Sequence, residues 1–111
     1  MDKYILDNDG NPIPCDDIFI WGEWYENNFE ARIVARYEIG DVCVSTVFLA
    51  LDHSFGDGPP LLYETMVFGL PEEHCERTST KQQAIKCHER YVYMVIQLAE
   101  DSTLASPRQT S

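Results

Sequence analysis

The amino-acid sequence predicts an α+β domain whose mostly antiparallel sheet carries two helices on one face. Two observations lead to this fold class. Residues 31–51 form an alternating apolar hairpin, and residues 16–28 and 79–99 have helical spacing. The expected order is strand, helix, hairpin, strand, a short strand near Glu76, and helix. We expect residues 1–101 to form this single domain and the polar residues 102–111 to be a disordered tail.

The hairpin is the best specified of these elements. Gly40-Asp41 is a two-residue turn with glycine first, which is typical of a type II′ turn. Alternate residues of its two strands then share an apolar face, whereas the other face is mixed. The predicted pairs on the apolar face are Ile39 with Val42, Tyr37 with Val44, Ala35 with Thr46, and Ile33 with Phe48.

The first helix is expected over residues 16–28. Asp16 or Asp17 caps its start, because a carboxylate there accepts from free backbone N–H groups. An inward stripe follows from residues spaced three and four apart, and neighbouring apolar residues widen it. The stripe consists of Ile18, Trp21, Tyr25 and Phe29, widened by Phe19, Ile20 and Trp24.

The last helix is expected to begin at Ser79, with Gln82 completing a capping box, and to end near Ala99. Its inward stripe consists of Ala84, His88, Tyr91, Val95 and Leu98. The run from Tyr91 to Ile96 is apolar around the whole helix, which a surface helix should not be. Either the domain covers both sides, or one side docks on a partner or a second copy; the predicted oligomer interface is Tyr93, Met94 and Ile96.

The remaining elements are simpler. Tyr4-Ile5-Leu6 is a short strand that ends at a turn over residues 7–12, and residues 61–68 form another strand. Residues 52–60 between the hairpin and that strand form a loop by composition.

The net charge of −11 limits the partners. Nineteen acidic residues against eight basic ones argue against direct binding of nucleic acid or anionic lipid, which need clustered Lys and Arg. The acidity fits a partner protein with a basic surface, imitation of DNA, or simple solubility. No apolar run is long enough for a membrane span and no export signal is visible, so we expect a cytoplasmic protein.

The four cysteines, Cys15, Cys43, Cys75 and Cys87, include no C-x-x-C pair. In a reducing cytosol we expect free, mostly buried thiols. Adjacent Cys87 and His88 point about 100° apart on a helix, so a zinc site there is disfavoured. No local signature supports a cysteine nucleophile. We therefore expect no catalytic residue, no metal and no cofactor.

The loop of residues 52–60 is the most distinctive segment. Asp52, His53 and Asp57 stand among glycines, a mixture that could hold a cation or serve acid–base chemistry. The glycines and prolines would equally shape a tight connection between strands, which is the favoured interpretation. A binding role comes next, with Asp52, His53, Phe55 and Asp57 as the contact surface.

Three stretches of the chain resemble a family of small, uncharacterised proteins of tailed bacteriophages and prophages. They are residues 4–7 with 10–17, residues 44–69 including LDHSFGDGPPLLYETMVFG, and Ser79-Thr80 opening a helix that reaches His88. The chain departs from the pattern after Gly69, where a Gly-rich turn is missing, and in the apolar run from Tyr91. The family has no assigned activity, so the resemblance implies a phage setting in the host cytoplasm and no reaction.

These observations favour a non-enzymatic phage accessory protein that binds another protein, with inhibition of a host enzyme or of an anti-phage defence system as the expected form. The second predicted contact surface is the acidic first helix, with Asp16, Asp17, Glu23 and Glu26. The alternatives are a small metal-dependent hydrolase using His53 and Asp57, and a component of the virion or of its assembly. The dimer through the last helix is a separate prediction.

Overall fold

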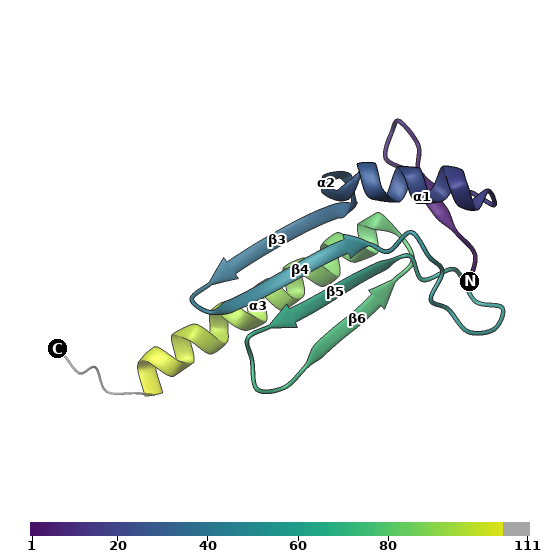
Figure 1. The fold of residues 1–111 in the computed structure, drawn as a ribbon. Coiled ribbons are helices and arrows are strands. Elements are labelled where there is room, and N and C mark those ends of the chain that lie inside the picture. Colours follow the sequence, from purple (N-terminus) through teal and green to yellow (C-terminus); the bar gives the residue numbers. More distant parts are fainter. Residues whose placement is uncertain (106–111) are drawn as a thin grey trace.

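The computed structural model describes the backbone of residues 1–105, with an antiparallel sheet and one long helix as its main body (Figure 1). The elements, in chain order, are β1 (Tyr4–Leu6), β2 (Pro12–Pro14), α1 (Ile18–Asn27), α2 (Phe29–Arg32), β3 (Ile33–Ile39), β4 (Val42–Phe48), β5 (Tyr63–Phe68), β6 (His74–Thr78) and α3 (Lys81–Ala105).

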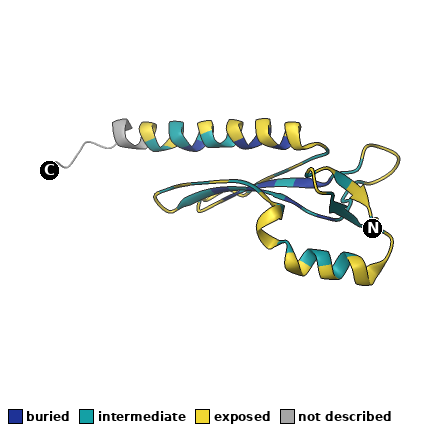
Figure 2. Ribbon diagram, turned by 90° about the horizontal axis from the view of Figure 1, so that it is seen from above, coloured by how far each residue is buried: buried dark blue, intermediate teal, exposed yellow. Residues whose placement is uncertain are grey.

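The predicted α+β class is confirmed. Strands β3, β4, β5 and β6 form an antiparallel sheet in that order, and β1 and β2 form a separate two-stranded ribbon. Helix α3 packs along one face of the four-stranded sheet and contacts all four strands. Figure 2 shows α1 on the other side of the sheet, beside its end. Both predicted helices were expected to pack on the same face of the sheet. Only α3 does so, because α1 lies on the other side.

The core lies between α3 and the sheet and has two parts. Around the middle of α3, Val44 and Val67 of the sheet meet Val95. Nearer the start of α3, Phe48 and Tyr63 meet Ala84, with Leu6, Trp21 and Trp24 packed around them. Alternate residues of β4 are buried, as a strand covered on one face requires.

The hairpin register is confirmed from the turn as far as Ala35, which pairs with Thr46. Beyond it the register shifts, so that Ile33 pairs with Val47 and not with Phe48. Such an irregularity shifts the pairing by one residue, so the side chains beyond it face the opposite side of the sheet from the one expected. The prediction that Ile33 faces the core is therefore wrong, and its side chain is 37% exposed.

The ends of α3 differ from the prediction. Thr80 Oγ1 accepts from the Gln83 N–H at 3.1 Å, and Gln83 Oε1 accepts from the N–H groups of Ser79 and Thr80. The capping box is therefore one residue later than predicted. The helix continues to Ala105, so its predicted end near Ala99 is wrong. Residues 106–111 of the predicted tail lie outside the described part.

Two short elements were not predicted. Strand β2 follows the Gly10 turn and pairs with β1, with Ile5 opposite Ile13. The single-turn helix α2 joins α1 to β3. Both are too short for a periodic pattern to develop.

Within the described residues, no helix combines the length and the apolar character that crossing a membrane requires.

We predict that Gly69→Ala destabilises the fold strongly. Gly69 has φ of +96°, and a Cβ there would clash with the backbone carbonyl oxygen of Asp41 in the hairpin turn. The strain and the clash should lower the free energy of unfolding by about 2 kcal/mol or more, measured by urea denaturation. The matched control is Gly58→Ala, where the added Cβ meets nothing within 4 Å. Equal midpoints for the two variants would contradict this packing.

Candidate functional site

The orientation of α1 is set by Trp21. Its indole N–H lies 3.1 Å from the carbonyl oxygen of Tyr4 and 3.0 Å from that of Ala50. The Trp21 ring stacks on Tyr25 at 5.0 Å, and Trp24 meets Phe48 edge to face. Trp24 and Tyr25 lie about 60° and 40° around the helix axis from Trp21, so the three rings form the inward face of α1.

The opposite face of α1 is both apolar and acidic. Viewed along the helix axis, Phe19 lies about 160° from Trp21. Glu26 lies about 20° to one side of Phe19, and Glu23 lies about 40° to the other side. The Phe19 side chain is 84% exposed. Ile18 and Ile20 lie about 100° around the axis to either side of Phe19, between the two faces, and are also exposed. We call this set, together with the acidic side chains around it, the α1 surface: Asp16, Asp17, Ile18, Phe19, Ile20, Glu23 and Glu26.

The sequence prediction was wrong for four of the apolar residues of this helix region. Ile18, Phe19, Ile20 and Phe29 were expected in the inward stripe, but all four are exposed. The inward side is taken by Trp21, which donates to the carbonyls of Tyr4 and Ala50, by Trp24, which meets Phe48, and by Tyr25. The only signal in the sequence was that seven apolar side chains are too many for one face of a short helix.

Asp17 is the cap of α1, as one of the two predicted alternatives had it. Its Oδ1 accepts from the N–H groups of Phe19 and Ile20 at 2.9 and 3.2 Å. This contact fixes the first turn and therefore the direction of the Phe19 side chain. Asp16, Glu23 and Glu26 are exposed. Between residues 16 and 30 the chain has five acidic residues and no Lys or Arg.

The structure gives the residues of the 52–60 loop different roles. Asp52 Oδ1 accepts from the N–H groups of Ser54 and Leu61 at 2.8 and 3.0 Å, which closes the loop. The hydrogen bonds from Ser54 lower the pKa of Asp52. His53 is half-buried, and its backbone N–H donates to the Leu61 carbonyl. Asp52 is thus a structural residue of the loop.

Phe55 stands at the tip of this loop with its side chain 97% exposed, and Asp57 is exposed near it in sequence. The N-terminal segment supports the base of the loop through its backbone. The Asp52 N–H donates to the Asp2 carbonyl, and Lys3 forms an isolated antiparallel β-bridge with Leu51. Figure 1 shows the loop and the first turn of α1 at the same end of the molecule. Two exposed phenylalanines therefore lie at the acidic end of the chain.

The predicted oligomer residues of α3 are divided. Tyr93 is 66% exposed, whereas Met94 packs against the core cluster of Val44, Val67 and Val95. Ile96 is half-buried. The sheet thus covers one side of the apolar run, and Tyr93 remains on the free side.

Polar side chains under α3 form a buried hydrogen-bond network. Thr46 Oγ1 lies 2.7 Å from Thr65 Oγ1 and 2.8 Å from His88 Nδ1, and all three residues are buried. Cys87 is buried beside them, and burial raises the pKa of its thiol. The network joins β4 and β5 to α3.

All four cysteines are free thiols. The expectation that most are buried is wrong: Cys87 alone is buried, Cys15 and Cys43 are half-buried, and Cys75 is exposed. Over the part of the chain with described side chains, no three His, Cys, Asp or Glu residues gather closely enough to hold a metal ion.

A scan against protein-family models and searches of curated proteins and of solved structures find no match to this chain.

We predict that His88 makes the stability depend on pH. Burial lowers the pKa of His88 in the folded protein below its unfolded value of about 6.5. Between these two values the unfolded chain binds more protons, so the free energy of unfolding falls as the pH is lowered from about 6.5. The slope approaches at most about 1.4 kcal/mol per pH unit and levels off below the folded pKa.

Urea denaturation between about pH 8 and pH 5 measures this slope. His88→Asn should be less stable at pH 8 and should lose this part of the slope. The control His53→Asn, in the half-buried loop residue, should keep it. An unchanged slope in His88→Asn would show that the His88 proton is not linked to folding.

Proposed function

We propose that this protein acts by binding another protein through the α1 surface. The observation that supports it best is Phe19, a residue 84% exposed in the first turn of a helix face whose charged groups are all acidic. The partner that fits is a protein with an apolar pocket for Phe19, bordered by Lys and Arg. In the phage setting that the resemblance implies, the partner is a host enzyme or defence protein that the complex inhibits.

The energetics favour such a contact. Moving an exposed phenylalanine side chain from water into an apolar pocket contributes about 1.5–3 kcal/mol. Ile18 and Ile20 extend the apolar area, and contiguous exposed apolar residues with a polar border are typical of interaction sites. Asp17 holds the first turn in place, so the ring is presented from a preformed helix and little ordering is needed on binding.

The acidic border contributes mainly to rate and selectivity. Carboxylates around the ring attract a basic partner and repel acidic ones. Phe55 at the loop tip is a second aromatic contact at the same end of the molecule, and it completes the loop surface predicted from the sequence. The role of Asp52 is to hold that loop closed, and His53, Phe55 and Asp57 are its proposed contacts.

We predict that Phe19→Ala weakens the complex about 30-fold or more, since a central aromatic contact contributes about 2 kcal/mol or more. The partner is first captured from host lysate with the tagged wild-type protein, then purified and titrated by calorimetry. Glu23→Gln with Glu26→Gln should slow association and reduce its dependence on salt.

The matched control is Phe68→Ala, which removes another exposed phenylalanine, at the end of β5. It should leave the affinity unchanged. If Phe19→Ala and Phe68→Ala bind the partner equally well, the α1 surface is not the site. Recovery of no stoichiometric partner would count against protein binding altogether.

We also propose self-association through α3 as a second candidate. Its 25 residues span about 37 Å, whereas the seven residues of β4 span about 24 Å, so the end of α3 extends past the sheet (Figure 1). Tyr93 is exposed on it, and so is Leu98, so the prediction that Leu98 belongs to the inward stripe is wrong. Light scattering should show a dimer at high concentration that Tyr93→Lys abolishes and Phe19→Ala preserves. A strict monomer would remove this candidate.

A further inference from the structure

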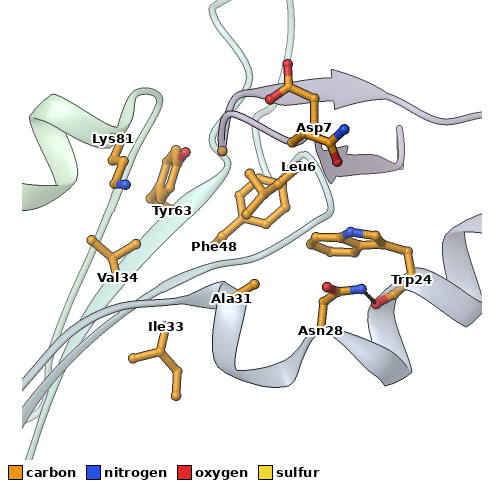
Figure 3. Close-up of a pocket in the computed structure, with 12 residues that line it drawn as sticks. Leu6, Asp7, Trp24, Asn28, Ala31, Ile33, Val34, Phe48, Tyr63 and Lys81 are labelled. Atoms are coloured by element: carbon orange, nitrogen blue, oxygen red, sulfur yellow. Dashed lines mark hydrogen bonds between the residues drawn. The ribbon is translucent and has the colours of Figure 1, made fainter.

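A cavity of about 380 Å³ lies where α1, the β1–β2 turn, the beginning of β3 and the start of α3 come together. Figure 3 shows its walls: Trp24 lies at one end, Tyr63 and Lys81 at the other, and Leu6 and Phe48 between them. Its volume is within the range of small-molecule sites. None of the sequence predictions concerned this place.

Tyr63 is the unusual member of the lining. Its side chain is buried, at 1% exposure, yet its hydroxyl group has no hydrogen-bond partner among the described residues. A buried polar group without a partner costs about 1–3 kcal/mol, and native proteins rarely leave one so. Tyr63 also lines the cavity, so a bound molecule that displaces the side chains around the hydroxyl can supply the missing partner.

The charges of the lining indicate the kind of molecule. Lys81 is the first residue of α3, where the helix dipole adds positive potential, and it takes part in none of the three ion pairs of the described residues. Asp7 also lines the cavity, but its Oδ1 accepts from the N–H groups of Asp9 and Asn11 at 2.9 and 2.8 Å and is engaged in the turn. The lining therefore carries one positive and one negative group: Lys81 lies on the same side of the cavity as Tyr63 (Figure 3), and the Asp7 carboxylate is held by the turn.

The opposite end is apolar. Trp24 and Phe48 meet edge to face with their centroids 6.0 Å apart, and both rings line the cavity together with Leu6 and Val34. Asn28 lines this end too, but its amide donates to the Trp24 carbonyl at 2.8 Å and so supports the helix end. An aromatic or branched apolar group fits against these walls.

We propose that this cavity binds a small, mainly apolar carboxylic acid. Its carboxylate accepts from the Tyr63 hydroxyl and pairs with the Lys81 ammonium, and its apolar body packs against Trp24 and Phe48. The site is separate from the α1 surface, because the cavity is lined by the inward side of α1 while Phe19 faces outward.

Titration of the full-length ¹⁵N-labelled protein with phenylacetate, followed by NMR, tests the proposal. Phenylacetate should cause saturable shifts of the Trp24 indole and of the backbone amides of Tyr63 and Lys81. Phenylacetamide, which is neutral, and benzylamine, which is cationic, should bind at least about tenfold more weakly, since one charge-assisted contact contributes about 1.4 kcal/mol or more.

Two variants examine the polar contacts, and thermal unfolding confirms that each is folded. Tyr63→Phe and Lys81→Gln should each weaken phenylacetate binding about tenfold. Lys86→Gln, in an exposed residue of α3 outside the lining, should have no effect.

Three results would overturn the proposal. No saturable shift up to about 20 mM phenylacetate would mean that water alone fills the cavity. Tighter binding of benzylamine than of phenylacetate would mean that Asp7 and not Lys81 selects the ligand. Equal losses in Lys86→Gln and Lys81→Gln would mean that the attraction is not local. These results do not depend on the proposed function, because binding of a partner protein to the α1 surface is measured in a separate experiment.

Discussion

The hydrogen bonds of the Trp21 indole N–H to the carbonyl oxygens of Tyr4 and Ala50 determine the arrangement of the whole acidic end. They join α1, β1 and the segment after β4. Ala50 is fully buried with φ of +64°, a conformation rare outside glycine, and its carbonyl also accepts from the Tyr4 N–H at 2.9 Å. Once Trp21 is fixed, Trp24 must face the cavity and Phe19 must face the solvent.

The proposed recognition surface and the proposed ligand cavity are therefore two sides of one helix. Trp24 closes the cavity from the inward side, and Phe19 with Glu23 forms the outward side. The sheet and α3 supply rigidity, through the two apolar clusters and the hydrogen bond between Thr46 and His88. No catalytic step is needed to explain any of these features, and the expectation of a binding protein without enzymatic activity stays a prediction.

The sequence predicted those elements in which a local pattern and its burial agree. The Gly40-Asp41 turn, the strands with alternating burial and the Asp17 cap depend on neighbouring residues alone. The shift near Ile33 and the exposure of Phe19 depend on contacts between distant segments, which periodicity does not contain. The cavity was missed for the same reason, since Leu6, Trp24, Tyr63 and Lys81 meet only in the folded chain.

The most direct measurement of the central claim is the solvent exposure of Phe19 in solution. Fluorophenylalanine is placed at position 19 or 48, and the ¹⁹F shift is compared in H₂O and D₂O. We expect a full solvent isotope shift at position 19, its loss when the partner binds, and none at position 48, which is buried. A shielded fluorine at position 19 in the free protein would contradict the outward orientation of α1 and with it the proposed binding surface.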